Sequence, residues 1–337
     1  MQTQTNATLR VNNLTTCFGV GEDRTVAVNG LSFSVNHGET LGIVGESGCG
    51  KSVTSLSIMR LLAKAGHITG GTIEFNGTNL LALAERQMRK LRGNRISMIF
   101  QEPMTSLNPT FTVGRQIAES IMLHQGKSNS EAMAAAIGLL NLVQISDAPR
   151  RLGEYPHQLS GGMRQRVMIA MALACEPDVL IADEPTTALD VTIQAQILEL
   201  LRDIQKRLGT AIVLITHDLG VVAQMCDRVI VMYAGRSVEE GLVEDVLERP
   251  QHPYTRALLR SLPAYSIDHE GAAAEAPRLA EIPGIVPVMT PKSVGCTFAP
   301  RCAEMRAICP VQDPPVVEFD HGQTARCWAR LAGEKSL

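Results

Sequence analysis

Eight consecutive residues, Gly45 to Ser52, have the composition and spacing of a phosphate-binding loop. Their sequence, GESGCGKS, matches the pattern G-x-x-x-x-G-K-S/T and follows the apolar run Leu41–Val44. Backbone N–H groups beside glycines can turn toward an anion at the start of a helix, where the helix dipole also favours negative charge. The alternative is a glycine-rich turn followed by a chance Lys-Ser pair, and the strand-loop-helix order argues against it. The expected phosphate-binding residues are Gly45, Glu46, Ser47, Gly48, Cys49, Gly50, Lys51 and Ser52.

Side chains suited to phosphoryl transfer lie in this loop and beyond it. The Lys51 ammonium is expected to reach the β- and γ-phosphates of a nucleotide such as ATP, and the Ser52 hydroxyl to ligate Mg²⁺. A second apolar run, 179–182, ends in Asp183 and Glu184. Asp183 would hold Mg²⁺ directly or through water, and Glu184 would orient or deprotonate the attacking water. The alternative is that the two carboxylates form an exposed strand end.

Two further features are candidates for contact with a nucleotide. Ser160, Gly161 and Gly162 precede a helical segment and form a second helix start at which N–H groups can bind an anion. Phe18 is expected either to lie against adenine or to pack in the core. Each feature is a weak signal by itself.

The elements that position these residues alternate between strands and helices. Alternating apolar residues predict half-buried antiparallel strands at Leu9–Asn12, Leu31–Val35 and Thr72–Phe75. Uninterrupted apolar runs predict buried parallel strands, whose carboxyl ends form the ligand-binding edge of an α/β sheet. Helical spacing predicts a helix over Thr192–Leu208 that ends at Gly209. We expect one face of it to be buried: Ile193, Ile197, Leu200, Ile204 and Leu208.

Length and composition exclude several classes of protein. At 337 residues the chain can bury a core and form more than one domain. No apolar run approaches the roughly 18 residues that a membrane-spanning helix needs, and the first residues are polar, so we expect a cytosolic protein. A net charge of −3 provides no general attraction for nucleic acid, so no nucleic-acid partner is expected.

The order of these motifs resembles that of ABC-type ATPases over roughly Leu9 to Gly241. The resemblance implies that Gln101 senses Mg²⁺ and water and couples to a membrane subunit, and that His217 contacts the γ-phosphate. Without the resemblance, Gln101 is an ordinary surface side chain and His217 a capping group. The resemblance also implies that Ser160, Gly161 and Gly162 contact ATP bound to a second ATPase subunit, with Asp190 at the interface between the two.

Three longer segments resemble the ATPase subunits of dipeptide and oligopeptide importers, a group that includes nickel and glutathione importers. They are 101–109 (QEPMTSLNP), 251–259 (QHPYTRALL) and 295–302 (GCTFAPRC). The resemblance implies a peripheral protein on the cytoplasmic face of the cell membrane. Its implied partners are two transmembrane permease subunits, a second ATPase subunit that is identical or paralogous, and, indirectly, an extracytoplasmic solute-binding protein.

Four of the eight cysteines lie near the C-terminus with the spacing C-x5-C-x6-C-x17-C. Thiolate sulfur suits zinc or an iron–sulfur cluster, and the tight cysteine pair typical of structural zinc sites is absent. Some dipeptide-importer ATPases carry a 4Fe–4S cluster on a similar tail. We therefore favour a 4Fe–4S cluster, with Zn²⁺ and uncoordinated thiols as alternatives. The expected ligands are Cys296, Cys302, Cys309 and Cys327.

The motifs and the resemblance together imply an α/β fold of the P-loop NTPase type. It would combine a RecA-like core, an antiparallel β-subdomain and an α-helical subdomain at about 102–175. We expect a nucleotide-binding domain over residues 1–245 and a small cysteine-containing extension over 246–337. Within the extension we expect a linker at 266–277, followed by loops without a large core.

The expected function is ATP hydrolysis that powers uptake of di- or oligopeptides or a related small solute. One alternative is a soluble ABC-type ATPase in DNA repair or translation, a class that usually has two ATPase halves or long insertions. Another is an adaptor that binds ATP without turnover. The single phosphate loop argues against the first alternative, and the presence of Glu184 and His217 argues against the second.

Overall fold

The computed structural model of the chain describes residues 7–101, 106–187, 189–261 and 282–331. The chain divides into two compact units. Unit 1 comprises residues 1–10, 34–40 and 73–215, and unit 2 comprises residues 11–33, 41–72 and 216–337. The C-terminal extension therefore shares a compact unit with the phosphate loop. The expected linker at 266–277, residues 102–105 of the expected helical subdomain and Ala188 lie outside the described residues.

A parallel three-stranded array carries the paired carboxylates of unit 1. Strand β7 (Val179–Asp183) lies between β6 (Ile96–Ile99) and β8 (Ala211–Thr216). All three strands are buried and mostly aliphatic, as parallel strands commonly are. Because the strands share one direction, their carboxyl ends meet at one edge, and β7 ends there in Asp183.

Helix α8 (Val191–Leu208) follows β7 and ends, as predicted, before Gly209. Asp190 caps its first turn, because Asp190 Oδ1 accepts a hydrogen bond from Ile193 N at 2.9 Å. Gly209 adopts a φ of +66°, which ends the helix and turns the chain away. Leu208, predicted to be buried, is 37% exposed because the helix stops there, short of a further turn against the core. The rest of the predicted face is buried at Ile197, Leu200 and Ile204 and half-buried at Ile193.

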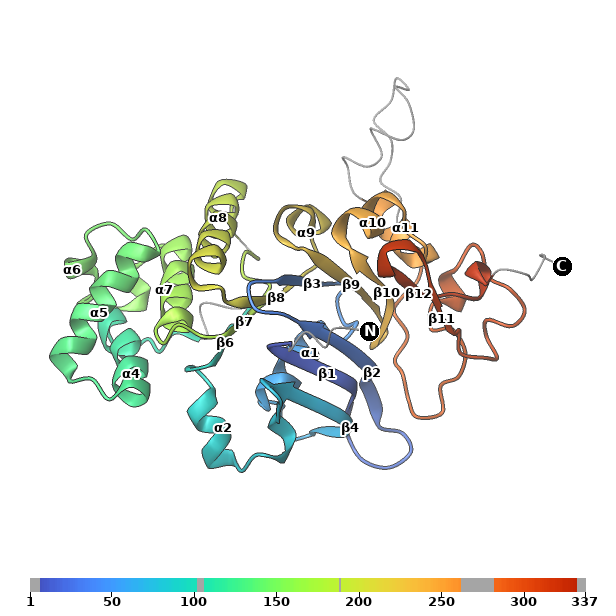
Figure 1. The fold of residues 1–337 in the computed structure, drawn as a ribbon, viewed down its shortest axis with the longest axis horizontal. Coiled ribbons are helices and arrows are strands. Elements are labelled where there is room, and N and C mark those ends of the chain that lie inside the picture. The colour runs from blue at the N-terminus through green and yellow to red at the C-terminus, as the bar shows by residue number, and fades with distance from the viewer. Residues whose placement is uncertain (1–6, 102–105, 188, 262–281, 332–337) are drawn as a thin grey trace, which may run out of the picture. The chain divides into compact units, whose positions relative to one another are not determined.

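Helices make up most of the described part of the expected helical subdomain, which is drawn in green shades in Figure 1. They are α4 (Val113–Gln125), α5 (Asn129–Leu142), α6 (Ala148–Arg151) and α7 (Gly161–Leu173). Helix α4 packs against both α5 and α7. Ser128 begins α5 with a capping box, which satisfies N–H groups that the helix itself leaves unpaired.

An antiparallel sheet forms much of the N-terminal part of unit 2. Strand β1 (Leu9–Phe18) lies between β2 (Thr25–Val35) and β4 (Gly66–Phe75). All three strands are longer than the segments predicted from apolar alternation. The pairing continues through Thr, Asn and Gly residues, which satisfy the strand geometry but carry no apolar signal.

A second set of paired strands in unit 2 connects the phosphate loop to the C-terminal extension. Strand β3 (Thr40–Val44) pairs in parallel with β9 (Arg228–Tyr233). Strand β10 (Arg236–Leu242) returns antiparallel to β9, and β12 (Thr324–Arg326) and β11 (Val316–Glu318) continue the sheet. The extension was expected to consist of loops, and this expectation is wrong for its last part. Those strands are short and partly polar, so the pairing of β12 with β10 and of β11 with β12 decides their structure.

The extension also contributes to a hydrophobic core, contrary to expectation. Its Phe298 ring lies 5.2 Å from the Tyr233 ring and 5.3 Å from the Tyr254 ring, between centroids. The two tyrosine rings lie 4.7 Å apart. Met289 is buried in the same cluster. These contacts could not be predicted because the extension has too few apolar residues for a core of its own and instead completes one built on β9.

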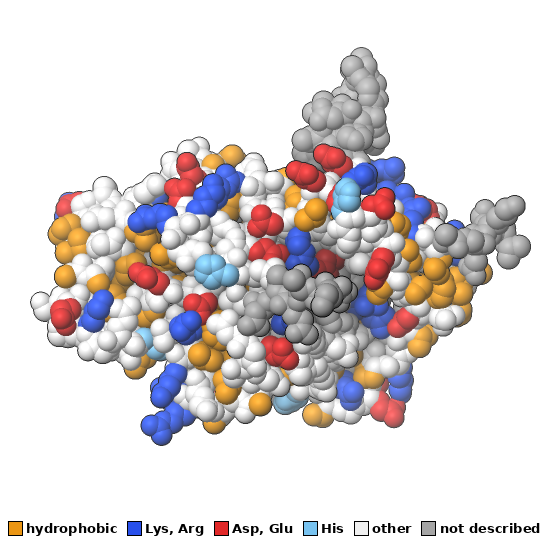
Figure 2. All heavy atoms as spheres, in the orientation of Figure 1, with side chains coloured by type: hydrophobic (Ala, Val, Ile, Leu, Met, Phe, Trp, Pro, Cys, Tyr) orange, Lys and Arg blue, Asp and Glu red, His pale blue; other side chains and the backbone are white. Residues whose placement is uncertain are grey.

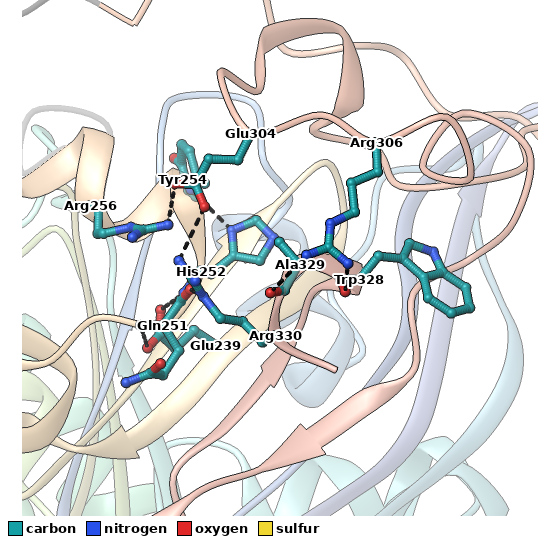
Figure 3. Close-up of polar contacts among 10 residues, drawn as sticks. All are labelled: Glu239, Gln251, His252, Tyr254, Arg256, Glu304, Arg306, Trp328, Ala329 and Arg330. Atoms are coloured by element: carbon teal, nitrogen blue, oxygen red, sulfur yellow. Dashed lines mark hydrogen bonds and ion pairs between the residues drawn. The ribbon is translucent and has the colours of Figure 1, made fainter. Parts of the chain in front are cut away.

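Polar contacts tie the end of the extension to its beginning (Figure 3). Glu239 of β10 accepts hydrogen bonds from Gln251 N at 2.7 Å and from His252 N at 2.9 Å. Arg330 donates to Gln251 O at 2.7 Å and to the Glu304 carboxylate at 3.2 Å. The last described segment is therefore fixed to the backbone just before helix α11 (Pro253–Arg260).

Large hydrophobic side chains are exposed along the middle of the extension. Figure 2 shows hydrophobic side chains at the surface of this part of the chain. Their exposed fractions range from 48% to 89%, at Ile285, Val288, Val294, Met305, Val311 and Val316.

The remaining elements are short. Among the described residues, no helix combines the length and the apolar character that crossing a bilayer requires. The other helices and strands are α1 (Lys51–Met59), α2 (Glu85–Leu91), α9 (Leu219–Met225), α10 (Val243–Glu248) and β5 (Thr78–Asn79). Single 3₁₀ turns lie at Leu80–Ala82, Pro156–Gln158, Ala299–Arg301, Asp320–Gly322 and Trp328–Arg330.

Candidate functional site

The phosphate loop, residues 45–52, joins β3 to α1, and its lysine folds back over it. Lys51 Nζ donates to Gly45 O at 2.7 Å and to Glu46 O at 3.0 Å. The Lys51 side chain is almost fully buried, with the residue 5% exposed. Its third donor reaches only Cys49 Sγ, at 3.8 Å, a weak contact that a phosphate oxygen can replace. The ammonium is thus held in place to meet an anion.

Backbone geometry requires glycine at two positions of this loop. Gly45 has a φ of +155°, and a Cβ there would lie 2.2 Å from Met232 O. Gly50 has a φ of +103°, and a Cβ there would lie 2.3 Å from Ala27 O. Backbone atoms cannot give way as flexible side chains can, so any larger residue would displace the loop. The close approach of β2 and β9 therefore fixes the shape of the phosphate cradle.

Other predicted nucleotide-site residues of unit 2 lie in or near the loop. Ser47 and Gly48 form its exposed tip. Cys49 is buried, and burial raises the pKa of its thiol even though the Lys51 ammonium acts in the opposite direction. Cys49 is therefore a neutral packing group at pH 7. Phe18 is half-buried at the end of β1, which leaves part of its ring accessible.

The predicted carboxylates of unit 1 lie at the end of β7, where Asp183 is 3% exposed. Glu184 follows with a φ of +48°, and its N–H donates to Ile215 O at 2.9 Å. Gln101 Nε2 donates to Glu184 Oε2 at 3.1 Å, and Thr187 Oγ1 donates to the same oxygen at 2.8 Å. A positive φ is unusual for glutamate, and such strain concentrates at functional positions. The structure thus brings Gln101 and Glu184 together, because β6 and β7 end at the same edge.

The start of helix α7 exposes two of the three predicted residues. Ser160 is exposed, and its Oγ caps the helix by accepting from Met163 N at 3.3 Å. A Cβ at Gly161 would meet no atom within 4 Å, whereas one at Gly162 would lie 3.0 Å from Ile193 of α8. Gly161 therefore faces open space and Gly162 is a packing position. Asp190, the cap of α8, is also exposed.

The predicted nucleotide residues divide between the two compact units. His217 is exposed directly after β8 and belongs to unit 2, as do Phe18 and the phosphate loop. Gln101, Glu184 and the start of α7 belong to unit 1. The contacts described above join residues within each unit. The assignment of both groups to one nucleotide stays a prediction.

Burial raises the pKa of three of the four C-terminal cysteines, Cys296, Cys302 and Cys327. Burial above all, with contributions from the Cys296 and Cys327 sulfurs, raises the pKa of Cys302 to about 11. Burial also raises the pKa of Cys296, with contributions from Cys309 and Cys327. None of the eight cysteines, all of which lie in described segments, forms a disulfide. Nevertheless, no three His, Cys, Asp or Glu side chains in the described part of the chain are arranged to hold a metal ion.

Sequence reasoning missed two residues that contact the phosphate loop from the extension. Tyr254 Oη accepts a hydrogen bond from Glu46 N at 2.9 Å. Arg301 pairs with the Glu46 carboxylate, with a shortest distance of 3.0 Å. Both residues lie in segments that the sequence singled out, but no spacing rule relates them to a loop more than two hundred positions earlier. Thr187, the hydroxyl partner of Glu184, was also missed.

Two family models match the chain. One, described as ABC transporter, matches residues 28–187. The other, described as oligopeptide/dipeptide transporter, C-terminal region, matches residues 238–309. The matches therefore cover both the phosphate loop with its paired carboxylates and much of the extension.

Similar proteins and structures agree with these matches. A probable peptide ABC transporter ATP-binding protein of Sinorhizobium fredii is 56% identical over 95% of this chain and 94% of that protein. The oligopeptide transport ATP-binding protein OppD of Salmonella typhimurium is 50% identical over 96% of this chain and 94% of its own length. The dipeptide transport ATP-binding protein DppD of Escherichia coli is also 50% identical, over 98% of this chain and 100% of its own.

Solved structures show the same fold for the ATPase part. The dimeric, post-hydrolysis ATP-binding cassette MJ0796 with ADP and Pi is 28% identical, with a TM-score of 0.63 over 70% of this chain and 98% of that one. CbiO1 from Clostridium perfringens, part of an ABC transporter complex, is 28% identical with a TM-score of 0.61, over 72% of this chain and 92% of that one. The chain therefore belongs to the ABC transporter ATP-binding proteins, in the group that carries the oligopeptide/dipeptide transporter C-terminal region.

Proposed function

We propose that this protein hydrolyses ATP and that its two groups of nucleotide residues serve one bound MgATP. The observation that carries the proposal is the phosphate loop, where a buried lysine is anchored over a cradle in which two positions admit only glycine. Ser52, Asp183 and Gln101 would hold Mg²⁺, which would neutralise charge on the phosphates. Glu184 would accept the proton of the attacking water, and Gln101 holds its carboxylate in place.

The remaining residues have supporting roles in this proposal. His217 would contact the γ-phosphate, and Phe18 would lie against adenine. The partial exposure of Phe18 and the exposure of His217 are compatible with these contacts. Two carboxylates after a buried strand, one of them with a strained backbone, support hydrolysis over simple nucleotide binding.

Substitution of the proposed base tests this function. Glu184→Gln keeps the size of the side chain and removes the proton acceptor, so ATP hydrolysis should fall at least about a hundredfold while MgATP still binds. Phosphate release measures the first quantity and titration with a fluorescent ATP analogue measures the second. Glu176→Gln, an exposed glutamate before β7, is the matched control and should hydrolyse ATP normally. Wild-type turnover in Glu184→Gln would contradict the proposal.

We also propose that two ATPase subunits close around the nucleotides. The exposed start of α7, formed by Ser160 and Gly161, and the exposed Asp190 support an interface at this part of unit 1. The similar cassette MJ0796 is described as dimeric. Glu184→Gln with MgATP should therefore elute as a dimer in size-exclusion chromatography, and adding Ser160→Arg should return it to a monomer. A strictly monomeric preparation that hydrolyses ATP at full rate would refute this.

The transported solute is proposed to be a di- or oligopeptide. Support comes from the C-terminal region match and from relatives described as peptide, oligopeptide and dipeptide transport proteins. The protein would lie at the cytoplasmic face of the cell membrane, bound to two permease subunits. A solute-binding protein would deliver the solute to those subunits. A role in DNA repair or translation is not favoured by any of these relatives. Uptake of a labelled dipeptide by cells with and without the gene tests the proposal, and equal uptake would contradict it.

We further propose that Cys296, Cys302, Cys309 and Cys327 hold a 4Fe–4S cluster. Support comes from the four cysteines gathered near the C-terminus with the spacing C-x5-C-x6-C-x17-C, because thiolate sulfur is the ligand of such clusters. The side chains would have to converge further than they do here to hold the cluster. Anaerobically purified protein should show broad absorbance in the visible blue and about four irons per chain. Zinc without iron would favour the alternative metal.

A further inference from the structure

The second residue of the phosphate loop, Glu46, contacts the C-terminal extension at two points. Its backbone N–H donates to Tyr254 Oη at 2.9 Å. Its carboxylate oxygens accept from Arg301 Nη1 at 3.2 Å and 3.0 Å. Tyr254 follows Glu46 by 208 positions and Arg301 follows it by 255. Both the main chain and the side chain of Glu46 are therefore held by residues that lie outside the ATPase motifs.

Arg301 is buried, and its guanidinium reaches acceptors on several sides. The Arg301 side chain is only 6% exposed. Besides Glu46, Nη1 donates to Tyr233 Oη at 3.1 Å. Nη2 donates to Ile282 O at 2.9 Å, and Nε donates to Pro283 O at 2.8 Å. A planar fork of donors can satisfy acceptors spread in this way, whereas the single ammonium of lysine cannot.

The contact with Tyr233 connects Arg301 to a second part of the loop. Tyr233 ends β9 and leads into a turn in which Gly235 N donates to Cys49 O at 2.9 Å. The Tyr233 ring also packs against Tyr254, which holds Glu46 N. Arg301 thus supports the start of the loop directly and its middle through the end of β9.

The same arginine supports the wall of a cavity beside the loop. The cavity has a volume of about 540 Å³. Glu46, Ser47 and Gly48 line one side, and the extension segment 284–289 lines another. Arg301 binds the two carbonyls that lead into this segment. The extension therefore shapes the space next to the exposed tip of the phosphate loop.

We propose that Arg301, together with Tyr254, is a positioning residue that holds the phosphate loop in its nucleotide-binding shape. The inference rests on the proposed ATPase function. When the guanidinium is removed, the Glu46 carboxylate loses a charge-assisted pair and the loop loses one of its two anchors in the extension. ATP affinity should fall, whereas the chemical step should persist at saturating ATP because Glu184 and Gln101 are untouched.

Arg301→Gln tests the proposal by separating affinity from turnover. In the Glu184→Gln background, the Kd of a fluorescent ATP analogue should rise about tenfold, the usual effect of losing a charge-assisted hydrogen bond. In the otherwise wild-type protein, KM for ATP should rise by about the same factor and kcat should change less than about twofold. Arg306→Gln is the matched control, because the Arg306 guanidinium donates to Trp328 O and Ala329 O in the last described segment of the extension. It should leave Kd and KM unchanged.

Further variants distinguish positioning from general stability. Arg301→Lys keeps the charge and should recover part of the affinity. Glu46→Gln should weaken binding, and combining it with Arg301→Gln should add little, because both changes remove the same pair. If Arg301→Gln does not fold, Glu46→Gln supplies the same affinity measurement.

Three outcomes test the positioning role of Arg301 and the function on which it rests. A Kd and KM for Arg301→Gln equal to those of an active wild type would overturn the inference alone. Additive effects of Glu46→Gln and Arg301→Gln would overturn it as well. A wild-type protein that neither binds nor hydrolyses ATP would instead refute the proposed function.

Discussion

The phosphate loop and the C-terminal extension share one compact unit, yet they are specified in different ways. Eight consecutive residues build the loop, and its lysine bonds carbonyls only five and six positions away. The extension depends on distant partners, because β12 pairs with β10 and Arg301 bonds Glu46. A local motif is therefore visible in the sequence, whereas a segment held by long-range contacts is not. The contact between the two also shows that a local motif can rely on a distant anchor.

The largest expected effect is in the loop itself, at Lys51. Lys51→Ala should lower ATP hydrolysis at least about a hundredfold and abolish detectable nucleotide binding, because it removes the buried charge that meets the phosphates. Phosphate release and analogue titration measure both effects. Lys64→Ala, an exposed lysine of the same unit, should behave as wild type. If Arg301→Gln in the extension proved as damaging as Lys51→Ala, the distinction between motif and anchor would be lost.

A pair of glycine substitutions sharpens the comparison within the loop. Gly50→Ala should lower the free energy of unfolding by about 2–4 kcal/mol, because its Cβ would lie 2.3 Å from the backbone oxygen of Ala27. Gly48→Ala should cost only about 1 kcal/mol, because its φ is positive but its Cβ would meet nothing within 4 Å. Urea unfolding measures both. Equal losses of unfolding free energy would show that the positive φ, and not the close approach of β2, is what disfavours a Cβ in this loop.

An effect that is absent at pH 7 and grows only in acid concerns the buried histidine of the extension. His252 is 1% exposed, and its Nδ1 accepts from Tyr254 N at 3.1 Å. Burial above all, together with the positive charges of Arg256 and Arg330, lowers the pKa of His252 to about 3, against a backbone hydrogen bond with Arg326. Below pH 6.5 the unfolded chain takes up this proton and the folded chain does not. Stability is therefore lost as the pH falls from about 6.5 toward 3.

His252→Asn isolates this contribution. Asparagine can still cap α11 but does not titrate, so the stability of the variant relative to wild type should rise by up to about 1.4 kcal/mol per pH unit below pH 6.5. Burial raises the pKa of the neighbouring Glu239, which acts in the opposite direction in both proteins and cancels in the difference. Urea unfolding at pH 7, 6 and 5 provides the measurement. Parallel pH profiles would show that His252 is not held neutral.

The parts of the site that could be predicted share one property, which is that few residues define them. The phosphate loop followed from glycine spacing, and the carboxylates followed from a buried strand that ends in Asp183. The helix over Val191–Leu208 followed from its period, its Asp190 cap and its terminal glycine. The exposure of Leu208 could not be predicted in this way, because a helical period shows which residues share a face but not where along the helix that face becomes exposed to solvent. The strands of the extension could not be predicted either, because their residues show no strand pattern of their own.

The sequence by itself determined the nucleotide chemistry, because short runs of consecutive residues contain the backbone cradle with its lysine and the paired carboxylates. Only the tertiary structure decided that the extension joins the core of unit 2 through Phe298 and that Arg301 and Tyr254 hold Glu46. The physical reason is that hydrogen bonds and packing depend on distance in space. Residues 208 and 255 positions apart reveal such contacts only once the chain has folded.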